Sequence, residues 1–469
     1  MLFNSFQFII FFPVICILYY IIPRKFTKLF LVIVSYLLYM NWKPAYALLL
    51  LYITIITYIG AINIQTLENQ HKKHRVIIFA IFTVLPLLFF KYYNFINSNI
   101  KELLSIFHLQ IDLPGLNWAI PIGISFFTFQ AYGYLMEVYY KKIEPEHNLL
   151  NYILFVSFFP QIASGPISRG INLLPQIKAG RIFDSAKIIE GMKFMLWGMF
   201  MKVVLADRIA IYVNTVLDNY NYQNGISCFI ASLFYTIQIY GDFAGYSLLA
   251  VGTGKIMGFD LINNFNRPYF ASSVTEFWKR WHISLTQWLT AYVYIPLGGN
   301  RCSKIRCYIN IFVTFLVSGL WHGANWTFIF WGWLHGMFQV IEKYTGLNSV
   351  STNIWKRTFR IILTFMIVNF AWIAFRMPTI RDTFAIYHKI FTDFTGPIFM
   401  PSDKTTIVFI IFALFIFILK EFTDEYYPNS LKIMNSNYTL IRWCGYLSII
   451  IIIMLLGVFD ASQFIYVSF

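Results

Sequence analysis

The sequence predicts an all-α, polytopic membrane protein, and three observations support that prediction. Of the 469 residues, 58% are hydrophobic and only 12% are charged, whereas roughly a quarter of the residues in a soluble domain are charged. The mean hydropathy is +0.62. Several apolar stretches also reach the roughly 20 residues with which a helix crosses about 30 Å of hydrocarbon. Because apolar segments extend along the whole chain, we expect residues 1–469 to form a single integral membrane domain.

The apolar stretches divide the chain into candidate membrane helices. Counting broken, re-entrant and interfacial segments, we expect about 11 to 13 helices. The first stretch has neither a basic segment before it nor a small-residue cleavage site after it, so we expect a retained span with a translocated N-terminus. The candidate spans are residues 2–22, 29–40, 45–64, 76–95, 118–139, 149–167, 192–204, 227–250, 309–320, 326–341, 361–375, 405–419 and 446–458.

Basic loops predict how these spans are oriented. The chain has 36 lysines and arginines against 21 acidic residues, a net charge of +15, and short basic loops stay in the cytoplasm. Clusters at residues 24–28, 71–75 and 141–142 follow the first, third and fifth spans, which are therefore expected to end inside. The alternation breaks after the sixth span, and a re-entrant or miscounted segment would explain the break. The basic residues that follow that span are Arg169, Lys178, Arg181 and Lys187.

The spacing of the cysteines and histidines along the sequence does not indicate a metal site. The five cysteines are scattered, and although Cys302 and Cys307 lie close in sequence, nothing places a base beside either for thioester chemistry. His335 lies thirteen residues beyond His322, which on one continuous helix would put the two on different faces. Five further histidines are expected to be solvated in loops: His71, His74, His108, His147 and His388.

Polar residues crowd between the apolar spans of residues 242–335, where they are costly in a bilayer and are usually paired or functional. Residues 276–290 repeat tryptophans at helical spacing, which predicts one amphipathic helix near the membrane interface. We expect Asp242 to form an ion pair with a buried base such as Arg267 or Lys255.

His322 stands between two apolar stretches, an unusual position for an ionisable side chain. Two interpretations are open. It could be a hydrogen-bonded histidine that joins two helices, or a general base, because an imidazole can accept a proton from a hydroxyl at neutral pH. Asn325, three residues on, would share a helix face with His322 and could orient it.

Seven motifs, in this order along the chain, resemble those of the membrane-bound O-acyltransferase family, in the branch of the bacterial alginate O-acetylation membrane protein. The combination is much more specific than any single motif. Ala244 departs from the serine of many relatives. The motifs are PIGISFFTFQ (121–130), FPQIASGPISR (159–169), QIYGDFAGY (238–246), NFNRPY (264–269), FWKRWHISL (277–285), YIPLGGNR (294–301) and LWHGANW (320–326).

The resemblance implies helices around a central funnel or tunnel, with a catalytic histidine at its narrow part. His322 matches that histidine and His282 matches the family's second histidine, so we expect both to be catalytic. We expect the substrates to be bound by neighbouring residues of the polar region: Trp278, Lys279, Arg280, Trp281, Trp321, Asn325, Asp242 and Arg267.

The expected reaction moves an acyl group, preferably acetyl, from cytoplasmic acetyl-CoA across the membrane for O-acetylation of a cell-surface or exported polysaccharide. No bound cofactor, metal or nucleic acid is expected. A basic group would attract the anionic donor: Lys279, Arg280, Arg301, Lys304 and Arg306. The resemblance also implies a bacterial inner-membrane location and an extracytoplasmic acetylesterase-like partner that completes the transfer.

Other functions stay open at this point. Peptidoglycan O-acetylation would use the same motifs on another acceptor. Teichoic acid D-alanyl transfer is less favoured, because that branch departs from the YIPLGGNR motif that this chain retains. A glycan or lipid transporter, or a structural component of an export complex, would need no histidine base.

Overall fold

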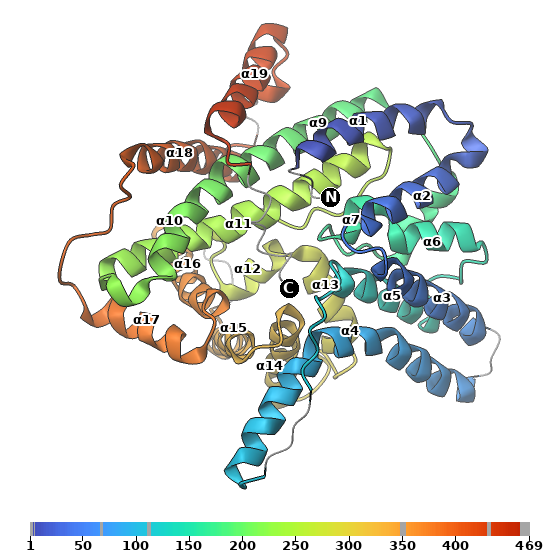
Figure 1. Cartoon of the computed structure of the whole chain (residues 1–469), viewed down its shortest axis with the longest axis horizontal. Coiled ribbons are helices and arrows are strands. Elements are labelled where there is room, and N and C mark those ends of the chain that lie inside the picture. Colours follow the sequence, from blue (N-terminus) through green and yellow to red (C-terminus); the bar gives the residue numbers. More distant parts are fainter. Residues whose placement is uncertain are drawn as a thin grey trace.

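The computed structural model describes residues 3, 5–65, 69–109, 114–347, 353–428 and 433–459, and this part of the chain is helical without a strand. Figure 1 shows long helices that surround a centre formed by shorter ones. Seven helices of the described part are long and apolar enough to cross a membrane, which confirms the predicted class. They are α3 (Tyr46–Gln65), α4 (Asn69–Ile106), α11 (Gly225–Ile256), α14 (Lys304–His322), α16 (Ile354–Arg376), α18 (Lys404–Tyr426) and α19 (Thr439–Leu456).

Most of the remaining helices are shorter, and several connect or cover the long ones. The predicted first, second and fifth spans correspond to α1 (Phe6–Ile21), α2 (Thr27–Met40) and α5 (Ile124–Tyr139). A run of amphipathic and interrupted helices has no counterpart among the predicted spans, because its apolar residues do not form long continuous stretches. These helices are α8 (Gly170–Ala179), α10 (Asp207–Leu217), α12 (Val274–Arg280), α13 (Ile283–Leu289) and α17 (Ile380–Thr392).

The sixth predicted span is broken into α6 (Leu149–Ser157) and α7 (Phe159–Ile162), each too short to cross a bilayer. The chain before α6 and the chain after α7 lie on one side, because Lys178 forms a 2.9 Å ion pair with Glu146. Arg181 donates at 2.8 Å to the carbonyl of Ile22, at the end of α1. The segment therefore behaves as a re-entrant one, which explains why the basic loops on both of its flanks belong to the same side.

The predicted span 192–204 is the middle of a longer element. It begins as α9 (Ser185–Met199), continues as the π-helix Phe200–Ala206 and leads into α10. Helix α9 packs along α11 at very short distance, since a Cβ atom added to Gly198 would lie 2.7 Å from the Gly245 carbonyl oxygen. Such small-residue contacts let helix backbones approach closely in membranes.

Helix α14 and α15 (Trp326–Thr345) form a hairpin that packs against α16 and α12 through α15. A Cβ atom on Gly319 would meet the Phe328 carbonyl oxygen at 2.3 Å, and one on Gly332 would meet the Phe315 carbonyl oxygen at 2.4 Å. The two glycines thus allow the hairpin to close tightly. This hairpin positions the histidines that the sequence singled out.

Candidate active site

His322 is the last residue of α14 and is 1% exposed. The chain then turns back through Gly323, which is extended, and enters α15 at Trp326. His322 and His335 therefore lie on two different helices, with the helix break at the junction between the predicted spans 309–320 and 326–341. The antiparallel return brings His335 back to the same centre, where it is fully buried.

Three histidines and three tryptophans alternate through this centre, and we call this row the His–Trp ladder. Its members, in spatial order, are His282, Trp321, His322, Trp331, His335 and Trp278. Successive ring centroids are 5.7, 4.8, 4.9, 4.8 and 5.1 Å apart. Such edge contacts between rings stabilise a buried cluster. The ladder keeps the imidazoles in a dry aromatic environment.

Additional rings close the sides of the ladder. Phe375 on α16 lies 5.1 Å from His322, and Phe243 on α11 lies 4.7 Å from His282. At the far end, the indole nitrogen of Trp278 donates to Nδ1 of His335 at 3.2 Å. An indole nitrogen can only donate, so Nδ1 of His335 is unprotonated and its proton is on Nε2.

His282 occupies a sharp break between α12 and α13, so the expected single amphipathic helix over 276–290 is wrong. Its backbone is left-handed, with φ 43° and ψ 54°, a conformation that costs L-residues about 1–2 kcal/mol. Neighbouring backbone bonds hold it: Ile283 donates to the Asn264 carbonyl and Asn266 donates to the Arg280 carbonyl, both at 2.9 Å.

The tryptophans on both sides of this break are buried. Trp281 is fully buried, whereas the expected interfacial helix would have left it at the membrane surface. Among the described residues, neither ring nitrogen of His282 has a hydrogen-bond partner. Strain at a buried polar side chain is typical of functional sites.

Lys91 and Tyr92 of α4 support the end of α14, and neither was predicted as a site residue. Lys91 is 6% exposed, and its Nζ donates to the Trp321 carbonyl at 2.5 Å and to Ser125 Oγ at 3.4 Å. The Tyr92 hydroxyl donates to the Leu320 carbonyl. A cation beside helix C-terminal carbonyls is favourable. The sequence did contain a signal for Lys91, because it is a lysine within the apolar run 76–95, and ionisable residues within membrane spans are usually paired or functional.

The motifs that are far apart in sequence meet around the ladder. Gln161 donates to the Gln130 side-chain oxygen at 2.9 Å, which joins two of the motifs. The Ile167 amide donates to Ser284 Oγ at 3.0 Å, beside the His282 break. Trp288 stacks on Phe129 with ring centroids 3.7 Å apart. Long-range contacts of this kind explain why the motifs occur together.

Asp242 does not pair as expected. Its carboxylate contacts Lys202 of the π-helix at 2.6 Å, and Lys202 contacts Asp207 at the same distance, with all three side chains buried. The partners expected for Asp242 are engaged elsewhere: Arg267 pairs with Glu425 and Lys255 pairs with Glu190. Hydropathy could not reveal this triad, because its lysine comes from a segment predicted as an ordinary span.

The other predicted substrate-binding residues are dispersed. Arg280 is held by Glu276 at 2.8 Å and by Glu425 at 3.0 Å, whereas Lys279 is exposed. Asn325 caps α15 by accepting from the Thr327 amide, and it donates to the Pro378 carbonyl at 2.8 Å. Both ends of its side chain are thus used, so its expected role in orienting His322 is wrong. Trp278 and Trp321 belong to the ladder itself.

The peripheral histidines are exposed, as predicted, but His71, His74 and His388 lie in helices rather than in loops. Within the described ranges, no group of three histidine, cysteine or acidic side chains is placed to hold a metal ion.

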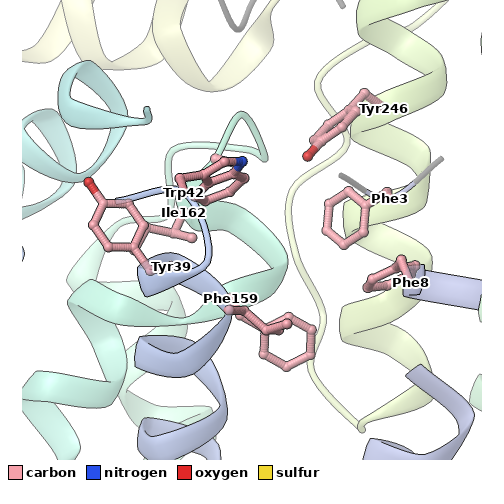
Figure 2. A pocket seen from close by; sticks show the side chains of 9 residues that line it. Phe3, Phe8, Tyr39, Trp42, Phe159, Ile162 and Tyr246 are labelled. Carbon is pink, nitrogen blue, oxygen red and sulfur yellow. The ribbon is translucent and has the colours of Figure 1, made fainter. Parts of the chain in front are cut away.

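A small aromatic pocket lies apart from the ladder, between α1, α2, α7 and α11. Figure 2 shows Tyr246, Phe3 and Phe8 on one side of it and Tyr39, Trp42 and Phe159 on the other. None of the predicted site residues lines this pocket, which is bounded by two of the motifs, at residues 159–169 and 238–246.

Comparison with known proteins assigns the family. The model of the membrane-bound O-acyltransferase family matches residues 38–381. The chain is 37% identical to the probable alginate O-acetylase of Pseudomonas aeruginosa, over 84% of this chain and 75% of the relative. It is 34% identical to the peptidoglycan O-acetyltransferase of Helicobacter pylori, over 82% and 79% of the two chains. Identity with the teichoic acid D-alanyltransferase of Bacillus subtilis is 29%, over 67% and 88%. The chain is therefore a multi-pass membrane protein that belongs to the membrane-bound O-acyltransferase family.

Proposed function

We propose that this protein transfers acetyl groups for the O-acetylation of an exported or cell-surface polysaccharide, with His322 as the general base. The observation that supports this most strongly is the place of His322, buried at the end of α14 where the motifs of the family meet. The relatives named as alginate O-acetylases support a polysaccharide acceptor.

In the proposed reaction an acceptor hydroxyl attacks the carbonyl carbon of an acyl thioester. The C–O bond forms as the C–S bond breaks, and His322 takes the hydroxyl proton and returns it to the leaving thiolate. His282, on the other side of Trp321, would position the donor or stabilise the developing oxyanion. The aromatic walls of the ladder would keep water from hydrolysing the thioester.

The donor in this proposal is cytoplasmic acetyl-CoA, and the location is the bacterial inner membrane. Coenzyme A is a phosphate-rich anion, and four basic side chains of the expected group are exposed for it: Lys279, Arg301, Lys304 and Arg306. An extracytoplasmic acetylesterase-like protein would receive the acetyl group and complete the transfer to the glycan.

Peptidoglycan is the second candidate acceptor, because a relative that is 34% identical is named for that reaction. Teichoic acid D-alanyl transfer is the weaker candidate, since identity with that relative is 29%.

The test uses a bacterial host in which the gene is deleted and replaced by variants, so that native partners are present. Ester-linked acetate released from purified surface glycans is measured for the intact protein, His322→Ala and His388→Ala, with membrane fractionation of each. We expect esters with the intact protein and the exposed control His388→Ala, and none with His322→Ala. Equal ester with His322→Ala would contradict the assignment and favour a transporter. The sugar that carries the ester separates polysaccharide from peptidoglycan.

A further inference from the structure

Two thiols face each other where the residue 294–301 loop joins α14. The Sγ atoms of Cys302 and Cys307 are 3.2 Å apart. Ser303 caps α14 by accepting from the Arg306 amide, so the cysteines occupy the positions just before the cap and in the first helical turn. Side chains at these two positions meet at many helix N-termini, where they are normally apolar. Here the helix geometry brings two nucleophilic sulfurs together instead.

Both thiols also hold the loop. The Gly299 carbonyl accepts from Cys302 at 3.3 Å, from Cys307 at 3.4 Å and from the side-chain Nδ2 of Asn310 at 3.3 Å. Gly298 and Gly299 have φ values of 116° and 54°, which turn this carbonyl toward α14. Each thiol has a single hydrogen, so it serves either this carbonyl or the opposite sulfur.

We propose that Cys302 and Cys307 form a redox-active dithiol, which a low-molecular-weight disulfide closes to an intramolecular disulfide that releases the Gly299 carbonyl. One cysteine sulfur attacks the oxidant and forms a mixed disulfide, and one thiol leaves. The second cysteine sulfur then attacks the first, and a second thiol leaves. One S–S bond forms in the protein as one breaks in the oxidant, and both cysteine protons end on the two released thiols.

The surroundings of the pair control how fast it reacts with an oxidant. Hydrogen bonding to Cys307 raises the pKa of Cys302, while the positive charges of Arg306 and Lys343 act in the opposite direction. A raised pKa means less thiolate at Cys302, so its reaction with a disulfide is slower at neutral pH and becomes faster as the pH rises. Cys302 is half-buried and is therefore more accessible to a small oxidant than Cys307, which is 5% exposed.

Closure would change how the loop is attached to the helix hairpin. Oxidation removes both S–H donors, so the Gly299 carbonyl would keep only the Asn310 amide. The adjacent Asn300 accepts from Lys343 of α15 at 2.7 Å, so the loop also contacts the second helix of the hairpin. The dithiol thus lies on the same hairpin that holds His322 at its opposite end.

The first test counts thiols in the purified full-length protein. Protein reduced with dithiothreitol or oxidised with glutathione disulfide is unfolded, labelled with N-ethylmaleimide and weighed intact. We expect five labels on the reduced protein, one for each cysteine, and two fewer after oxidation, without dimer. Cys302→Ser should take the same number in both states, whereas the control Cys444→Ser should still lose two. Equal labelling of the reduced and oxidised wild-type protein would overturn the proposal.

The second test measures release of the loop. Backbone amide hydrogen exchange in a peptide that covers residues 294–301 should become faster after oxidation of the wild-type protein and stay unchanged in Cys302→Ser. Loss of two labels with unchanged exchange would overturn the proposed release. Neither test uses acyl transfer, so both are independent of the proposed function.

Discussion

Single residues in the centre are held mainly by backbone groups of other helices. Lys91 reaches across from α4 to the last carbonyls of α14, immediately before His322. The His282 backbone is fixed by a segment that is distant in sequence. These supports are long-range, so residue spacing could not have predicted them, whereas His322 itself could be found from its motif and its apolar surroundings.

Replacing Lys91 with methionine keeps the side-chain length but removes the donor to the Trp321 carbonyl. We expect Lys91→Met to lower the free energy of unfolding by about 1–3 kcal/mol, the cost of a buried group left without its hydrogen bond. Thermal unfolding of the purified protein measures this effect. The control is Lys73→Met on the same helix, where the lysine is exposed. Equal melting temperatures for the two variants would contradict a structural role of Lys91.

Interruptions of helices, rather than the helices themselves, create the site. The long spans were predictable because their apolar runs are continuous. The π-helix that ends at residue 206 and the break at residue 282 were not, because each depends on contacts with another part of the chain. In the π-helix, the wider turn places Lys202 between Asp207 and Asp242. A helix pattern read from one segment contains no information about such partners.

We expect the buried triad of Lys202, Asp207 and Asp242 to stabilise the fold. Lys202→Met would leave two buried carboxylates without their cation, so we expect a loss of about 3–5 kcal/mol in the free energy of unfolding. Lys187→Met is the matched control, because its 2.6 Å pair with Asp260 is exposed and such pairs contribute about 0–1 kcal/mol. Detergent-solubilised protein is followed by thermal unfolding. If both variants melt alike, the triad does not stabilise the fold.

Across the whole molecule, contacts agree with the orientation that charge predicts. Tyr46 and Tyr58 lie toward opposite ends of α3, where Tyr46 donates to the Ala119 carbonyl and Tyr58 to the His147 carbonyl. The loop before α5 and the loop after it are thereby attached to α3 at points twelve residues apart, which is about 18 Å along the helix axis. The sequence predicted the sides from its basic clusters, and the broken alternation after the sixth span already indicated a re-entrant or miscounted segment there, where α6 and α7 are each too short to cross.

Cysteine labelling of intact cells tests this topology. In a variant whose native cysteines are replaced by serine, we expect a membrane-impermeant maleimide to label Gly115→Cys but neither His147→Cys nor Lys178→Cys. All three positions are exposed, so accessibility of the side chain is not limiting. Labelling at residue 178 but not at residue 147 would mean that α6 and α7 span the membrane after all.

The π-helix also forms a contact between two segments that are synthesised at different times. At its end the Asp207 amide bonds the Lys202 carbonyl, five residues back, and the next carbonyl, that of Val203, accepts from the Val458 amide at 2.9 Å. Roughly 250 residues separate these partners, which at about 5–20 residues per second is on the order of ten to fifty seconds of synthesis. During that interval the Val203 carbonyl has no Val458 to bond. The segment that follows α19 therefore completes, late in synthesis, a contact whose acceptor is made in the first half of the chain.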